Sequence, residues 1–171
     1  MISNSSSFFT LQKTGNILYL AIVAILSTSF AAFATEDNLQ KSMEIAVQGT
    51  SFQAQRMTIA AENLANESST SMQPGGEPYR RKVIFAKNTY DRKLGARTVQ
   101  VAKYDTSQTP FERKYDPNHP AADLNGYVLL PNVNRDIERA DASEAQRSYE
   151  ANLGVIEVSR SMIQKTIDAI K

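Results

Sequence analysis

The residues with the clearest potential for chemistry lie in one segment past the middle of the chain. Asp116, His119 and Asp123 could together bind a metal ion, since carboxylates and imidazole are common metal ligands. Asp116 and Asn118 have the spacing that opens a calcium loop, but the glutamate that closes an EF-hand is missing. We therefore interpret the segment as a turn, in which Asp and Asn side chains bond to nearby backbone, and expect no metal site.

A second candidate is the basic run Arg80-Arg81-Lys82, which could bind a phosphate or an acidic polymer such as a peptidoglycan strand. Such runs more often face solvent or form ion pairs at an interface. The sequence has no nucleophile–base signature, no glycine-rich phosphate loop and no cysteine, so we expect no catalytic or cofactor-binding residue and no enzyme. Two alternatives stay open: a periplasmic ligand-binding module that uses the basic run, and a metal-dependent enzyme centred on His119.

The chain of 171 residues carries a formal net charge of only +1, which argues against a nucleic-acid partner. Residues 1–34 have the pattern of a secretory signal peptide: Lys13, an apolar run over 17–26, and a small-residue end at Ala32-Phe33-Ala34. We expect cleavage after Ala34, with a retained membrane anchor as the alternative. An exported chain without cysteine must rely on its core or on partners for stability.

A long helix is predicted at the C-terminal end of the chain. Its apolar residues recur at spacings of three and four, which indicates a seam that packs against another helix. Asp141 with Glu144 forms a capping box for its start, although Asn134 could begin the helix earlier. The predicted packing residues are Tyr149, Asn152, Leu153, Ile156, Ile163 and Ile167.

A second helix of similar length is predicted over residues 38–66, directly after the signal segment. Two matched helices at opposite ends of a chain favour an antiparallel, coiled-coil-like pair. Its predicted packing residues are Leu39, Met43, Met57, Asn63, Leu64 and Asn66.

Both helices carry apolar residues beyond the seam. Ile45, Phe52 and Ile59 recur every seven residues on one helix, and the other carries the further set Val155, Val158 and Met162. Either the segment between the helices folds back over these residues, or other subunits cover them. We favour the second explanation, because the segment is small for covering two long helices.

The segment between the helices, residues 72–134, is predicted to form a small β-rich insert. Strands are expected over 79–85, 98–101 and 127–130, with loops over 109–111 and 115–120 and a turn at Asn125-Gly126. The predicted fold is α+β. It consists of a cleaved segment (1–34), a terminal-helix unit (35–71 with 135–171) and the insert (72–134).

Several motifs in this order resemble the bacterial flagellar rod and hook protein family, and the middle ones resemble its proximal-rod members. The resemblance covers residues 39–171, and any one motif is weak by itself. The N-terminal signature is Glu62-Asn63-Leu64-Ala65-Asn66 and the C-terminal one is Arg147-Ser148-Tyr149-Glu150-Ala151-Asn152. Between them lie Pro78-Tyr79-Arg80-Arg81-Lys82, Tyr115-Asp116-Pro117-Asn118-His119-Pro120-Ala121-Ala122-Asp123 through Gly126-Tyr127-Val128, and Pro131-Asn132-Val133-Asn134.

The resemblance implies a structural subunit of the flagellar basal body, in the rod that crosses the periplasm. Subunits of this family polymerise through their terminal helices into a tube that transmits torque for motility. The implied partners are further copies of the chain, the rod subunits FlgB, FlgF and FlgG, and the rod-base adaptor FliE, with no nucleic acid, small-molecule substrate or cofactor. Asn63, Asn66, Tyr149 and Asn152 are then packing and capping residues. The signal segment departs from the family, whose members are normally exported through the flagellum's own channel.

Overall fold

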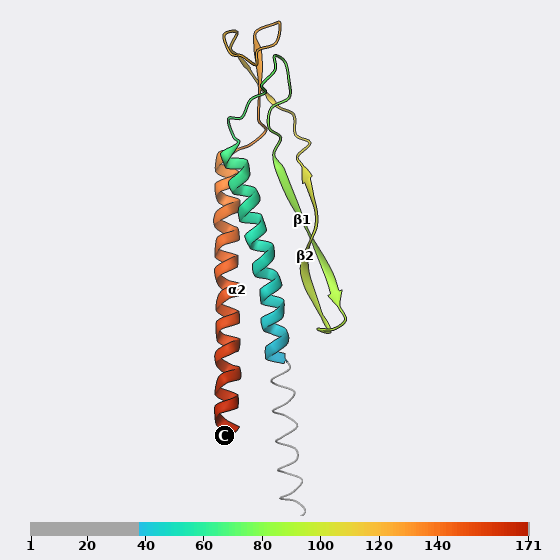
Figure 1. Ribbon diagram of the computed structural model, residues 1–171, viewed down its shortest axis with the longest axis vertical. Helices are drawn as coiled ribbons and strands as arrows, with labels where there is room; N and C mark the ends of the chain where they lie inside the picture. The colour runs from blue at the N-terminus through green and yellow to red at the C-terminus, as the bar shows by residue number, and fades with distance from the viewer. Residues whose placement is uncertain (1–37, 171) are drawn as a thin grey trace, which may run out of the picture.

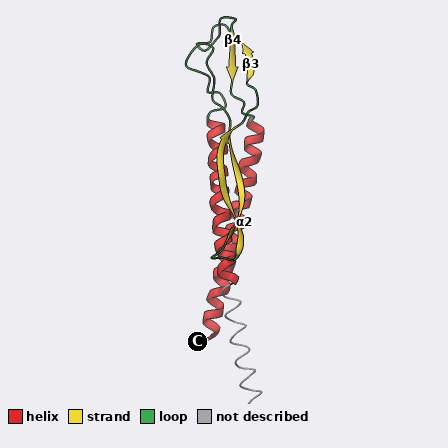
Figure 2. Cartoon of the chain, turned by 90° about the vertical axis from the view of Figure 1, so that its right-hand side faces the viewer, coloured by secondary structure: helices red, strands yellow, loops and turns green. Residues whose placement is uncertain are grey.

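The computed structural model describes residues 38–170, which form a long, narrow molecule (Figure 1). Two long helices lie side by side and run in opposite directions. A β-hairpin follows them on one side, and a smaller hairpin with its loops forms a tip at the end where the helices are joined (Figure 2). The predicted cleavage at Ala34 lies outside the described residues. No helix in the described part of the chain is both long and apolar enough to span a membrane.

The C-terminal helix, α2, covers Arg135–Ile170, and the N-terminal helix is helical over 38–65 within the described range. The Asn134 side-chain oxygen accepts hydrogen bonds from the backbone N–H groups of Asp136 (3.0 Å) and Ile137 (3.1 Å). Asn134 is therefore the N-cap, and the earlier of the two predicted starts is confirmed. A start at Asp141 is wrong, because the helix is already capped by Asn134, seven residues upstream.

The long hairpin pairs β1 (Lys82–Asp91) with β2 (Ala96–Thr106) in antiparallel register, with a bulge between Phe85 and Ala86. Both strands are longer than predicted. The first strand also begins at Lys82 rather than Tyr79, because the backbone N–H groups of Tyr79 and Arg81 bind Ser69 and Asn132 instead of a strand.

The short hairpin at the tip pairs β3 (Glu112–Tyr115) with β4 (Tyr127–Leu130). The predicted strand over 127–130 and the turn at Asn125-Gly126 are confirmed, since Gly126 has the positive φ of 78° that favours glycine. Strand β3 was not predicted. Its four residues are all exposed and show no apolar alternation, so only the pairing with β4 identifies it.

The two helices approach each other closely at Gly49. A methyl group added there would lie 2.8 Å from the side-chain nitrogen of Asn152 on α2. Small or polar residues dominate the helix-facing side of α2, which permits this approach. Nine buried or half-buried positions of α2 recur at intervals of four and three residues, with Asp141 and Ser148 half-buried beside them: Glu138, Ala142, Ala145, Tyr149, Asn152, Ile156, Ser159, Ile163 and Thr166.

This side of α2 differs in part from the predicted seam. Tyr149, Ile156 and Ile163 are half-buried as expected, whereas Leu153 and Ile167 are 42% and 40% exposed. The difference arises because Ala, Asn, Ser and Thr occupy the alternate positions of the repeat, and a pattern of large apolar residues does not find them. An assembly role for Leu153 and Ile167 remains a prediction.

The long hairpin covers the second apolar stripe of the N-terminal helix. Phe52 is buried and lines the same cleft as Val99 of β2, while Ile59 lines a cleft with Val83 and Ile84 of β1. The favoured explanation, that other subunits cover this stripe, is therefore wrong for Phe52 and Ile59, whereas Ile45 lines an open groove. That explanation takes the insert to be compact, but an extended two-stranded hairpin covers more of a helix than a compact insert of the same length.

The glycines of the two helices provide a stability test of the close approach. Gly154→Ala should raise the free energy of unfolding by about 0.5–1 kcal/mol, because alanine favours helix and nothing lies within 4 Å of the added methyl group. Gly49→Ala should gain clearly less, because the methyl group must displace the Asn152 side chain. Chemical denaturation followed by circular dichroism measures both. Equal gains would contradict the packing at Gly49.

Candidate functional site: a buried polar junction

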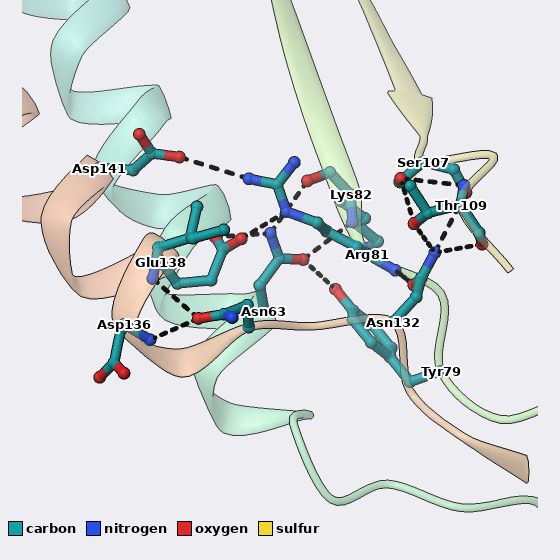
Figure 3. Close-up of polar contacts among 12 residues, drawn as sticks. Asn63, Tyr79, Arg81, Lys82, Ser107, Thr109, Asn132, Asp136, Glu138 and Asp141 are labelled. Atoms are coloured by element: carbon teal, nitrogen blue, oxygen red, sulfur yellow. Dashed lines mark hydrogen bonds and ion pairs between the residues drawn. The ribbon is translucent and has the colours of Figure 1, made fainter. Parts of the chain in front are cut away.

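A network of polar side chains lies where the two helices, the long hairpin and the tip meet (Figure 3). At its centre is Asn63, whose side chain is fully buried near the end of the N-terminal helix. Its oxygen accepts hydrogen bonds from the Tyr79 hydroxyl and the Lys82 N–H, both at 2.9 Å. Its nitrogen donates to the Lys82 carbonyl (2.9 Å) and to Glu138 Oε2 (3.0 Å). All four hydrogen-bonding positions of the amide are therefore satisfied within the chain.

Glu138, in the first turn of α2, is a buried carboxylate with partners for both oxygens. Oε1 accepts a charge-assisted hydrogen bond from Arg81 Nε at 2.5 Å, and Oε2 accepts the one from Asn63. Arg81 also reaches Asp141 one turn further along α2, at 3.3 Å. A carboxylate buried away from water is costly unless it is paired and hydrogen-bonded, and Glu138 is both.

The tip is fixed to the hairpin through Asn132. Its side-chain oxygen accepts a hydrogen bond from the Arg81 N–H at 2.8 Å. Its side-chain nitrogen donates to the carbonyl and hydroxyl oxygens of Thr109, at 3.0 and 2.9 Å. Arg81, which directly precedes β1, therefore binds α2 through its side chain and the tip through its backbone. The relative positions of the long hairpin, α2 and the tip all depend on this residue.

The connections between helix and tip are reinforced at the ends of both helices. Asn66 closes the N-terminal helix: its side chain donates to the Glu62 carbonyl at 2.9 Å and accepts from the Ser69 hydroxyl at 3.1 Å. Glu67 then pairs with Arg135 at the start of α2. The hydrogen bond from Arg135 lowers the pKa of Glu67, but both groups are solvent-accessible, so the pair contributes little to stability.

The tyrosine of the junction has a strongly shifted pKa. Burial, followed by the negative charges of Glu62 and Glu138, raises the pKa of Tyr79 to about 12. The hydroxyl is therefore protonated at neutral pH and donates its hydrogen to Asn63.

The basic run forms internal contacts rather than an open anion site. Arg81 binds Glu138, and Lys82 pairs with Glu62. Arg80 lies over the Phe111 ring, 4.1 Å from its centroid, and donates to the Ser107 carbonyl at 3.2 Å. All three cations therefore have partners within the described chain, as expected of ion pairs at an internal interface.

His119 shapes a turn in the tip. Its ring Nδ1 accepts a hydrogen bond from the Ala121 backbone N–H at 3.0 Å, and the backbone N–H of His119 donates to the Asp116 carbonyl at 3.2 Å. Asp123 accepts hydrogen bonds from two backbone N–H groups of the next turn, which lower its pKa. Among residues 38–170, no three metal-binding side chains come together.

Sequence reasoning identified Asn63 and Arg81 but missed two of their partners. Glu138 lies seven residues before Ala145, so the helix repeat extended upstream places it on the buried side of α2, but no local signal shows which side chains bind it. Asn132 lay within a recognised motif, but no local signal showed that its side chain binds the hairpin. These partners are far apart in sequence, and only the fold brings them together.

Comparison with known proteins identifies relatives over most of this chain. The family described as "Flagellar basal body rod FlgEFG protein C-terminal" matches residues 124–169, which include most of α2. "Flagellar basal-body rod protein FlgC" of Agrobacterium fabrum is 44% identical over 79% of this chain and 97% of its own length. The proteins of the same name from Salmonella typhimurium and Borreliella burgdorferi are 41% and 39% identical, over 72% and 75% of this chain and 92% and 95% of their own lengths.

An elongated helical subunit with this C-terminal match is a structural protein of the bacterial flagellar rod. The identity and coverage go further: the chain belongs to the flagellar basal-body rod protein FlgC family. The resemblance seen in its motifs is thereby confirmed, and the family locates the protein in the flagellar basal body.

Removal of the guanidinium group at the junction should be strongly destabilising. Arg81→Ala leaves the buried Glu138 carboxylate without its ion pair and should lower the free energy of unfolding by about 3 kcal/mol. Arg135→Ala is the matched control. It removes a second arginine–glutamate pair between distant segments, but a solvent-accessible one, so its effect should be much smaller. Similar losses in urea denaturation would contradict the importance of burial at Glu138.

Tyr79 should make the stability of the protein sensitive to alkaline pH. A group whose pKa is higher when folded stabilises the fold fully below its unfolded pKa of about 10 and loses that contribution as the pH rises through the folded value of about 12. Unfolding free energies measured across this window should therefore fall more steeply for the natural chain than for Tyr79→Phe. Identical slopes would show that Tyr79 ionises normally.

Proposed function

We propose that the protein polymerises through its terminal helices within the flagellar rod and transmits torque, without catalysing a reaction. The observation that carries this proposal is the apolar stripe on α2, formed by Val155, Val158 and Met162, which are 45%, 59% and 51% exposed. The long hairpin covers the equivalent stripe on the N-terminal helix but leaves these residues exposed to solvent. Contiguous exposed apolar residues of this kind mark a surface that another protein covers.

The helices are proposed to pair as an antiparallel coiled coil. The buried or half-buried positions of α2 follow intervals of four and three along its length, the period of a helix packed against a neighbour. The close contact between Gly49 and Asn152 supports direct pairing. Together with the insert over 72–134, the pair would form the two-part subunit expected from the sequence.

The polar junction supports a mechanical role. A subunit that passes torque to its neighbours must resist rotation between its own parts. Glu138 binds both Asn63 of the N-terminal helix and Arg81 of the hairpin segment, so both helices and the hairpin are joined at one end. Because these groups are buried and fully hydrogen-bonded, any relative movement would leave polar atoms unpaired, which is costly.

Family membership suggests the partners. We propose that the chain contacts further copies of itself, the rod subunits FlgB, FlgF and FlgG, and the rod-base adaptor FliE, in a rod that crosses the periplasm. Delivery through the general secretory route, with cleavage after Ala34, belongs to the same proposal. A cell-wall-binding module is less well supported, because the three cations that it would use all have partners within the described chain.

A charge placed on the exposed stripe should block assembly without unfolding the subunit. Val158→Asp should reduce incorporation into isolated basal bodies at least about tenfold, because burial of an unpaired carboxylate costs more than the 1.4 kcal/mol that corresponds to that factor. Ser161→Asp introduces the same charge one turn away, outside the stripe, and should assemble normally. Both variants should retain the helical circular dichroism of the natural chain. Normal incorporation of Val158→Asp would refute assembly through this surface.

A further inference from the structure

The two helices and the long hairpin together form the part of the molecule that we call the stalk. An open groove lies between these three elements, beside the exposed stripe of α2. Its volume is about 750 Å³. Most of the side chains around it are apolar or small, and each of the three elements contributes some of them. Those used below are Ile45, Gly49 and Phe52 of the N-terminal helix, Arg97 and Val99 of β2, and Val155 of α2.

The tip carries apolar side chains that are exposed to solvent. Leu124 is fully exposed in the loop between β3 and β4, and Met72 is almost fully exposed in the loop that follows the N-terminal helix. The Gly75 N–H donates to the Ala121 carbonyl at 3.1 Å, so the two loops support each other. The backbone hydrogen bonds to Asp123 also hold Leu124 in a fixed turn. The tip therefore presents an ordered apolar projection.

The charges beside these two features are complementary. The tip loop over 116–126 contains Asp116 and Asp123 and no lysine or arginine, and Asp123 pairs with Arg113 of β3 at 3.4 Å, so Asp116 carries the loop's uncompensated negative charge. The end of the long hairpin, residues 87–97, borders the groove and contains four basic residues and one acidic residue. Arg97 lines the groove itself and has no ion-pair partner among the described residues. Opposite charges on the tip loop and on the hairpin end beside the groove favour contact between these two surfaces, and oppose contact between two copies of the same surface.

We propose that the tip of one copy, led by Leu124, docks in the stalk groove of a second copy, with Asp116 beside Arg97. The contact is head-to-tail, because it joins two different surfaces of the subunit: the tip, at the end where the helices are joined (Figure 1), and the groove, which lies beside the middle of α2. A head-to-tail contact that does not close on itself continues into a helical polymer. The inference deepens the proposed polymerisation, on which it rests, by naming the surfaces that join successive copies.

The absence of cysteine in the natural sequence makes disulfide trapping a clean test. A chain with both Leu124→Cys and Val155→Cys is expressed in place of the natural one, and isolated basal bodies are oxidised. Val155 lies about 30 Å along α2 from its start at ~1.5 Å per residue, so a disulfide within one copy is excluded. Each head-to-tail contact can then be locked, and species of three or more copies should form. Either single variant can give dimers at most.

The matched control pairs Leu124→Cys with Met162→Cys. Met162 lies on the same exposed stripe but two turns beyond Val155 and outside the groove, about 10 Å away at ~1.5 Å per residue. A disulfide requires Cα atoms within about 7 Å, so this pair should cross-link at least about tenfold less. Equal yields from the two pairs would overturn docking in the groove.

The outcomes separate this inference from the proposed function. If the chain is present in basal bodies but forms no disulfide between positions 124 and 155, or forms one only with another protein, docking between copies is refuted and the rod function stands. If the chain is absent from basal bodies, the rod function fails, and oxidation of the concentrated purified chain decides the docking. If the cysteine variants misfold, a second experiment replaces them: sedimentation measures the self-association of the Arg97→Glu variant. We expect this self-association to be weaker than that of the natural chain and of Arg97→Lys. Unchanged self-association would overturn the proposal.

Discussion

The hydrogen bond between Asn63 and the buried carboxylate of Glu138 is the contact on which the rest of the structure depends. A buried carboxylate requires nearby donors, and here they come from two segments that are far apart in sequence. Asn63 supplies one from the N-terminal helix and Arg81 supplies the other from the segment before β1. Satisfying Glu138 therefore fixes where the N-terminal helix ends, where α2 begins and where the long hairpin starts.

Below the junction, packing rather than polar contact sets the helix spacing. Gly49 meets Asn152, and small residues such as Ala145 and Ser159 occupy the buried side of α2. Small side chains let the helices approach closely but bury little apolar area, so the pair gains only modest stability from its own interface. The long hairpin adds to this by covering Phe52. The subunit is therefore held firmly at one end and more weakly along its length.

The features that the sequence predicted are those set by residues close together in the chain, and the features that it missed depend on residues far apart in the chain. The long helices are evident from periodicity that repeats over many turns, and the cap at Asn134 was one of the two starts considered. Strand β3 was missed because a fully exposed polar strand has no pattern apart from its partner. The buried role of Glu138 was missed because its partners are 75 and 57 residues away, and no local propensity reports such a distance.

Polar and apolar groups have different roles in this subunit: buried polar groups fix its shape, and exposed apolar groups favour its assembly. The junction satisfies its polar atoms within one chain, so it gives the subunit a defined shape before any partner binds. The stripe containing Val158 leaves apolar area in water, so the gain from covering it is realised only on assembly. A rigid subunit loses little further conformational freedom when it binds, and more of the gain from buried surface then appears as affinity. The buried Asn63–Glu138 contact thus strengthens assembly indirectly, although it lies apart from the surface that we propose for assembly.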